Sequence, residues 1–187
     1  MVIDGIPPKK RFDAYSALPI LIYCETGNAD TWLAETEALY SQFGSPLSGT
    51  HYMYFRDRMS ILRRLERYDE ALQSGQHYLD LLDSEGTDDP VQRRWWKSDT
   101  LGARIRIQSI TGDEEGLKAT LEIALDNIQA YQSEWNSAVA GEADTQRREE
   151  LDATYRRFAG YAVHNLGAVC SRAGCFAEAV TLLERVL

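Results

Sequence analysis

Residues 160–187 constrain the fold more than any other part of this sequence. Gly167 and Ala179 lie twelve residues apart, and Gly174 stands between them, where a left-handed residue would end the first of two helices. Small residues at these two points let two helix backbones approach closely. Bulky residues at helical spacing form the apolar stripes of both helices: Leu166, Cys170, Phe176, Leu183 and Val186. The segment therefore predicts a helix hairpin with a tight crossing.

This pattern resembles the tetratricopeptide repeat (TPR), whose landmarks are a Leu-Gly pair, a later Ala and bulky residues at fixed distances from both. Here the pair is Leu166-Gly167 and the later Ala is Ala179. Val163, Cys170 and Leu183 stand where the family usually has Trp, Tyr and Phe. The resemblance implies an all-α, TPR-like α-solenoid of about four antiparallel helix hairpins in a right-handed superhelix. An ordinary hairpin within a helix bundle is the alternative.

One hairpin cannot bury its own apolar face, so a repeat protein needs further copies. A second match consists of residues in the same roles: Phe55, Met59, Leu62, Tyr68 and Ala71. A third unit is expected around residues 112–117, with Gly116 as its small residue. A fourth flanks Gly27, with Trp32 and Ala34 beyond the turn. These partial matches predict that hairpins occupy most of the chain.

Helical periodicity and stop signals predict about eight helices, and no stretch shows the alternation of a strand. The expected ranges are 12–25, 29–43, 50–66, 69–83, 90–110, 113–137, 145–173 and 176–187. The small residues lie farther apart than the roughly 34 residues of a strict TPR array, which predicts an extension around 132–145. We expect one helical domain over 12–187 and a flexible arm over 1–11, which holds the run Pro7-Pro8-Lys9-Lys10-Arg11.

The charges are unevenly distributed along the chain. The net charge is −9, which argues against nucleic-acid binding because the phosphates would be repelled. Of the 20 Lys and Arg residues, five lie in each of the segments 56–67, 93–106 and 147–172, which are the predicted first helices of three hairpins. In the TPR family the first helices line a concave surface. The resemblance therefore implies an arginine-rich groove for an acidic peptide or protein, whereas pairing of these arginines with neighbouring acids is the alternative.

Offsets from the apolar stripe predict which side chains face this groove. On the last complete hairpin they are Tyr161, His164, Asn165, Ala168 and Arg172, and on the second match they are Met53, Arg56, Asp57, Ser60 and Arg64. The helix at 90–110 has no certain register, so Arg104 or Arg106 could serve. Asn165 directly precedes the Leu-Gly pair, where TPRs that clamp a peptide carboxylate often carry Asn, but Asp57 stands at the equivalent place and the clamp's lysines are missing.

Residues suited to catalysis or metal binding are sparse. His51, His77 and His164 fall on three different predicted elements. The three cysteines, Cys24, Cys170 and Cys175, show no zinc-ligand spacing, and no glycine-rich phosphate loop is present. We therefore expect no enzyme activity, no cofactor and no metal, and a chain that acts by binding a partner.

The remaining expectations concern location and context. No apolar run of 18 residues and no signal peptide is visible, which predicts a cytoplasmic protein that does not enter a membrane. The chain begins with Met1 and stops inside an amphipathic helix without a polar cap. We expect either further sequence beyond Leu187 or a homodimer through the C-terminal helix. Besides an interaction module, the alternatives are a ligand-sensing regulatory domain with an output domain beyond Leu187, or an accessory subunit of an enzyme.

Overall fold

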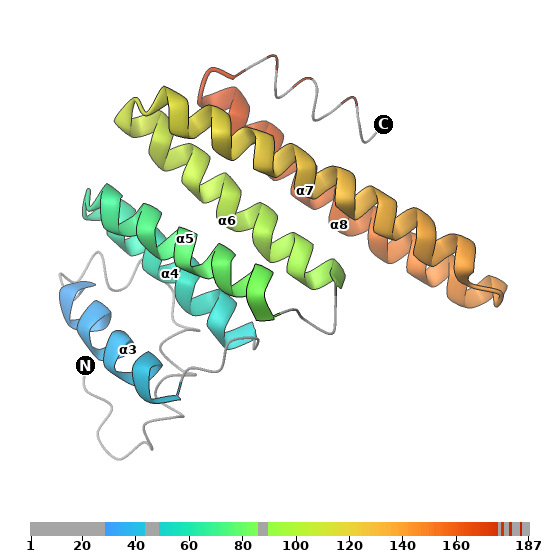
Figure 1. Ribbon diagram of the computed structural model, residues 1–187, viewed down its shortest axis with the longest axis horizontal. Coiled ribbons are helices and arrows are strands. Elements are labelled where there is room, and N and C mark those ends of the chain that lie inside the picture. The colour runs from blue at the N-terminus through green and yellow to red at the C-terminus, as the bar shows by residue number, and fades with distance from the viewer. Residues whose placement is uncertain are drawn as a thin grey trace. The chain divides into compact units, whose positions relative to one another are not determined.

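The computed structural model describes residues 29–43, 49–85 and 90–175, together with Ala177, Val180 and Glu184 (Figure 1). All regular secondary structure in these residues is α-helical, in agreement with the predicted all-α class. The helices are α3 (Ala29–Phe43), α4 (Gly49–Arg64), α5 (Tyr68–Glu85), α6 (Pro90–Thr111), α7 (Glu114–Gly141) and α8 (Thr145–Arg172). The chain divides into two compact units, residues 1–86 and 87–187, which are described separately. A single domain over 12–187 stays a prediction.

Six of the predicted helices are confirmed, with ends within a few residues of the expected ones. The largest difference is in α7, which continues past residue 137 to Gly141. The predicted helix at 12–25 lies outside the described residues. The predicted helix from 176 lies largely outside them, including its expected crossing and stripe residues Phe176, Ala179, Leu183 and Val186.

In the first unit, α4 packs against both α5 and α3. The middle of α4 turns apolar residues toward both neighbours, and Met59, Ile61 and Leu62 are almost completely buried. Ala71 on α5 has no exposed surface, as expected for the small residue of a close crossing. Ala34 on α3 is exposed, and the helix expected to pair with α3 lies outside the described residues, so its place in a fourth hairpin stays a prediction. Trp32 and Thr36 form the buried side of α3.

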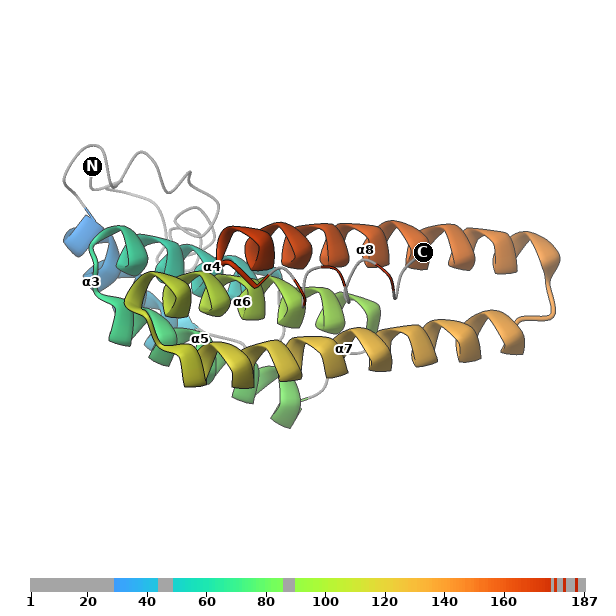
Figure 2. The same cartoon turned by 90° about the horizontal axis from the view of Figure 1, so that it is seen from above.

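In the second unit, α6 packs against both α7 and α8, and these two long helices also pack against each other (Figure 2). Trp96, Leu101, Ile105 and Ile107 of α6 are buried, which is typical of a helix covered on more than one side. The helices α7 and α8 have 28 residues each against 22 for α6, and they run past its end.

Where α7 and α8 extend beyond α6, they form a small core of their own. Its buried residues are Tyr131, Tyr155 and Ala159, with Trp135, Ala138 and Leu151 packed against them. The Tyr131 hydroxyl donates a hydrogen bond to the Tyr155 carbonyl at 3.1 Å. The turn that joins the two helices ends at Asp144, whose carboxylate caps α8 by accepting from the Arg147 N–H. The extension expected around 132–145 is therefore confirmed as a longer hairpin.

Three helix ends share one backbone conformation. Helices α4, α6 and α8 are followed by the left-handed residues Glu66, Gly112 and Gly174, with φ of 59°, 71° and 80°. In each case the next N–H reaches back to the carbonyl five residues earlier: Arg67 to Leu62 at 2.9 Å, Asp113 to Gln108 at 3.0 Å and Cys175 to Cys170 at 2.9 Å. This bond is the signature of the Schellman motif. The helices α4, α6 and α8 therefore end in the same way.

The shared turn gives the hairpins a common register. The residues seven positions before the left-handed residue are Met59, Ile105 and Gly167, and all three are buried. Five positions after it stand Ala71 and Leu117, so Leu117 occupies the place that Gly116 was expected to fill. The crossing role of Gly116 is therefore wrong.

Gly116 has a different role at the start of α7. Its N–H donates to the carboxylate of Asp113, the N-cap residue, at 3.0 Å. A Cβ at this position would collide with that carboxylate and would lie 2.6 Å from Gln108 Nε2. Glycine leaves room for this arrangement of the cap, whereas a side chain here would require Asp113 and Gln108 to shift.

The turn after α4 offers a stability test, because Glu66 adopts a conformation that glycine holds in the other two turns. A left-handed residue with a side chain destabilises the folded state by about 1–2 kcal/mol, and replacement by glycine removes this strain. Part of the gain in stability is offset because glycine makes the unfolded chain more flexible. We predict that Glu66→Gly raises the free energy of unfolding in urea by roughly 0.5–1 kcal/mol. Glu66→Ala should show no such gain, and Gly112→Ala should lose about 1 kcal/mol. An equal gain from Glu66→Ala would assign the effect to charge instead of backbone conformation.

Candidate functional site

Three of the predicted site arginines are exposed. Arg64, Arg106 and Arg172 form no ion pair with any residue that the structure describes, and His164 is exposed as well. Arg64 and Arg172 both lie two residues before the left-handed residue of their turns, so the equivalence expected from sequence spacing agrees with the turn geometry. The side chains of Tyr161 and Asn165 lie outside the described part of the chain.

The common register also orients α6. From the sequence alone, either Arg104 or Arg106 could be the groove-facing residue of this helix. Arg106 stands six residues before Gly112, the position that Ser60 and Ala168 hold in their hairpins and that was predicted to face the groove. Arg104 stands at the position of Leu166, which is buried, and it is itself half-buried. Arg106 is therefore the equivalent of the predicted groove residues.

Asp57 is buried, although the sequence predicts that it lies on the groove-facing stripe of α4. Its side chain is 2% exposed, and Arg56 donates to its Oδ1 from Nε at 3.1 Å and from Nη2 at 2.9 Å. Burial raises the pKa of the Asp57 carboxyl to about 6, although the charge and hydrogen bonds of Arg56 oppose this shift. Arg56 is thus engaged by its chain neighbour, and Asp57 is not available as an open groove residue.

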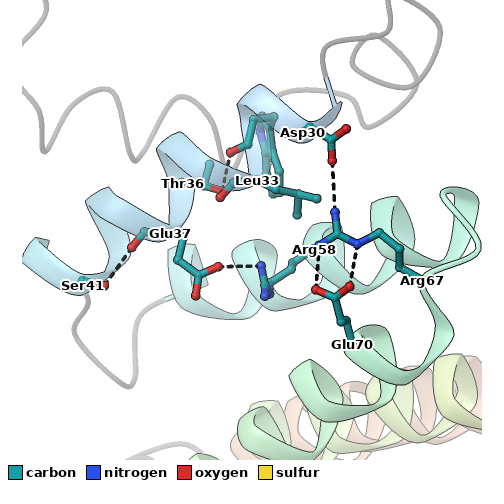
Figure 3. A network of polar contacts seen from close by, with 9 residues as sticks. Asp30, Leu33, Thr36, Glu37, Ser41, Arg58, Arg67 and Glu70 are labelled. Carbon is teal, nitrogen blue, oxygen red and sulfur yellow. Dashed lines mark hydrogen bonds and ion pairs between the residues drawn. The ribbon is translucent and has the colours of Figure 1, made fainter.

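Several other arginines bridge neighbouring helices (Figure 3). Arg58 of α4 lies 2.9 Å from Glu37 of α3, and Arg67 binds Asp30 of α3 at 3.0 Å while its fork holds Glu70. Hydrogen bonds from Arg67 lower the pKa of the Glu70 carboxyl below its ordinary value. The pairing alternative raised by the sequence therefore holds for these arginines.

In the second unit, Arg94 bridges two helices in the same way. Arg94 of α6 donates to Glu134 Oε1 of α7 at 2.7 Å and to Asn127 Oδ1 at 3.3 Å. Asn127 is buried and also donates to the Arg94 carbonyl and to Ser98. This network joins α6 to α7, although the buried Glu134 Oε2 accepts no hydrogen bond from the described residues.

A cleft of about 490 Å³ lies between α3 and α5, with α4 as its floor. Its volume falls in the range of small-ligand and peptide-anchor sites. Three carboxylates line it, Glu37, Glu70 and Asp80, against the single guanidinium of Arg58. The cleft is therefore acidic, in contrast to the arginine-rich groove expected from the sequence.

Aromatic rings line the floor and both walls of this cleft. The Tyr40 and Tyr54 rings stack with centroids 4.8 Å apart, and the His77 ring lies 5.6 Å from that of Phe55. Burial raises the pKa of the Tyr54 hydroxyl. Tyr40 is half-buried and His77 exposed, so these two rings are the ones that a ligand can reach.

Sequence reasoning missed this cleft because it followed the first helices of the hairpins. The signal was present in the second helices: Glu37 and Tyr40 are three residues apart on α3, and Gln73, His77 and Asp80 recur at three- and four-residue spacing on α5. Residues at such spacing share one helix face. Only the fold shows that these two polar faces line one cleft.

A second cavity, of about 470 Å³, lies near the joined ends of α7 and α8. Trp135 stacks on Tyr155 with ring centroids 6.2 Å apart, and the Arg156 guanidinium lies 5.7 Å from the centroid of the Trp135 ring. The Trp135 Nε1–H donates to Asp152 at 3.1 Å, and Arg156 donates to the same carboxylate at 2.8 Å. These groups satisfy one another, which favours a structural role.

Comparison of the chain with known proteins gives no match to a family model, a curated protein or a solved structure. No described helix has the length and apolar character to cross a membrane. Within the described residues, His, Cys, Asp and Glu do not gather in groups of three or more suited to a metal ion. The structure thus defines an all-α protein whose function has to be argued from its surfaces.

The buried Asp57 carboxyl gives a pH-dependent test. Because its folded-state pKa lies above the ordinary value, the folded protein binds more protons than the unfolded chain between about pH 4 and 6, and this group lowers stability as pH rises through that window. We predict that the free energy of unfolding of Asp57→Asn, minus that of the wild type, grows by up to about 3 kcal/mol from pH 4 to pH 7. Urea unfolding across this range measures it.

The matched control is Asp69→Asn, which removes an exposed carboxylate from α5. The pH-dependent gain of Asp57→Asn should clearly exceed that of this control. A flat difference for Asp57→Asn would show that this carboxyl titrates normally and is hydrated in the folded protein.

Proposed function

We propose that the chain is a TPR-like, non-catalytic interaction module that binds an anionic peptide or protein. The observation that carries the proposal is the recurrence of one left-handed turn after α4, α6 and α8. Buried residues stand at the same distance before each turn, as in proteins built from repeated helix hairpins.

Packing inside the units supports the same proposal. The helix α6 contacts its own hairpin partner α7 and also α8, the first helix of the next hairpin. Successive hairpins that share such contacts bury a continuous core, and the opposite faces of their first helices stay open to a partner. Among the described residues, the exposed arginines lie on these first helices, apart from Arg67 in the turn after α4.

The anionic character of the partner follows from Arg64, Arg106 and Arg172. These side chains are exposed, and no described acid neutralises them, while other arginines of the same helices are engaged in bridges. Arginine binds carboxylate or phosphate with two parallel hydrogen bonds. An exposed and unpaired guanidinium is therefore a contact that a partner's carboxylate can complete.

Fluorescence anisotropy of a labelled peptide, Glu-Glu-Ala-Glu-Glu-Ala, tests this proposal against its Gln-for-Glu analogue. The wild type should bind the Glu peptide more tightly than the Gln analogue. Its affinity should fall as salt rises, because the screening length between charges is only about 8 Å at physiological ionic strength. The Arg64→Ala/Arg172→Ala double variant should lose about tenfold or more, since a desolvated charged hydrogen bond contributes about 1.5–3 kcal/mol.

The matched control is Arg147→Ala/Arg156→Ala, which removes two equally charged side chains that already have acidic partners on or next to α8. This variant should keep wild-type affinity to within about twofold, because exposed ion pairs contribute little. Equal losses in both double variants would reduce the effect to net charge and reject Arg64 and Arg172 as specific contacts.

A further inference from the structure

The acidic cleft of the first unit has binding capacity that its internal contacts leave unused. Glu37 bonds Arg58 through Oε2 and Asp80 accepts from Gln76 through Oδ1 at 2.7 Å. Within the described residues, Glu37 Oε1 and Asp80 Oδ2 accept no hydrogen bond. The side chain of Glu37 is 58% exposed, so its carboxylate is open to a ligand.

A second observation in the cleft also indicates a missing polar partner. Ser74 lines the cleft at 7% exposure, and its Oγ forms no hydrogen bond with the described residues. A serine within a helix commonly bonds the carbonyl one turn earlier, as Thr36 and Thr100 do in α3 and α6. Buried hydroxyls without a partner are uncommon, so the wall of the cleft holds a hydrogen-bonding group that the described residues leave unused.

The aromatic rings of the cleft indicate which kind of ligand group would suit it. The half-buried ring of Tyr40, stacked on Tyr54, presents an electron-rich face, and His77 borders it. A flat cation gains from such a face and from nearby carboxylates at the same time. The guanidinium of arginine is planar and carries five N–H donors, so it suits stacked rings flanked by acids better than an ammonium group does.

We propose that the cleft between α3 and α5 binds an arginine side chain presented by a partner peptide. The guanidinium lies over Tyr40 and donates to Glu37 and Asp80, and the peptide backbone lies along the cleft between the two helices. This site is separate from the exposed arginines of the first helices, and it selects the opposite charge. The two sites can therefore be tested independently.

The probe is a labelled peptide, Ala-Arg-Ala-Ala-Arg-Ala, compared with the same peptide carrying citrulline in place of arginine. Citrulline keeps the shape of the side chain and removes its charge. In anisotropy titrations the wild type should bind the arginine peptide about tenfold or more tightly than the citrulline peptide. The Glu37→Gln/Asp80→Asn variant should lose that difference, and Ser74→Ala should weaken binding less.

The matched control is Glu35→Gln/Asp69→Asn, which removes one carboxylate from each of the same helices, away from the cleft lining. It should bind the arginine peptide like the wild type to within about twofold, because rim and distant charges contribute little. Urea midpoints of all variants, measured in parallel, separate loss of binding from loss of folding.

Two results would overturn the proposal. Equal binding of the arginine and citrulline peptides, or equal losses in both double variants, would show that the cleft does not recognise the cation. Competition by free arginine at the peptide's own concentration would make the cleft a small-molecule site and exclude a peptide partner. Neither result bears on the acidic peptide, whose binding depends on Arg64 and Arg172.

Discussion

The hydrogen bond that closes each first helix is the constraint on which the rest of the structure depends. A left-handed residue after α4, α6 and α8 lets the following N–H reach the carbonyl five residues earlier, which ends the helix and reverses the chain within a few residues. The reversal sets the register of the second helix against the first. The same register then decides which side chains enter the core and which stay exposed.

Much of this fold could be predicted from the sequence because its signals are local. Gly112 and Gly174 mark two of the turns, and apolar periodicity gave six helices with ends close to the observed ones. Register could not be predicted where a local signal misled. Spacing predicts Gly116 as a crossing residue, whereas its N–H donates to the cap of Asp113, and Glu66 adopts the left-handed conformation without being glycine.

The candidate sites were less predictable, because they depend on pairs of residues far apart in the chain. The exposure of Arg64, Arg106 and Arg172 follows from helix periodicity, but sequence cannot show that Arg58 reaches Glu37 on another helix or that Asp57 is buried. The cleft was missed for the same reason. Its acids and rings stand on three helices, and only their packing brings them together.

The extension of α7 and α8 past α6 has a consequence for local stability. Among the described helices, each of the two is covered there by the other alone, and the buried core of this region is the cluster around Tyr131 and Tyr155. Regions with few buried contacts open at a lower free-energy cost than the body of a domain. Amide hydrogens near Gly141 and Thr145 should therefore exchange first, so that the hairpin opens from its tip while the three-helix part of the unit stays folded.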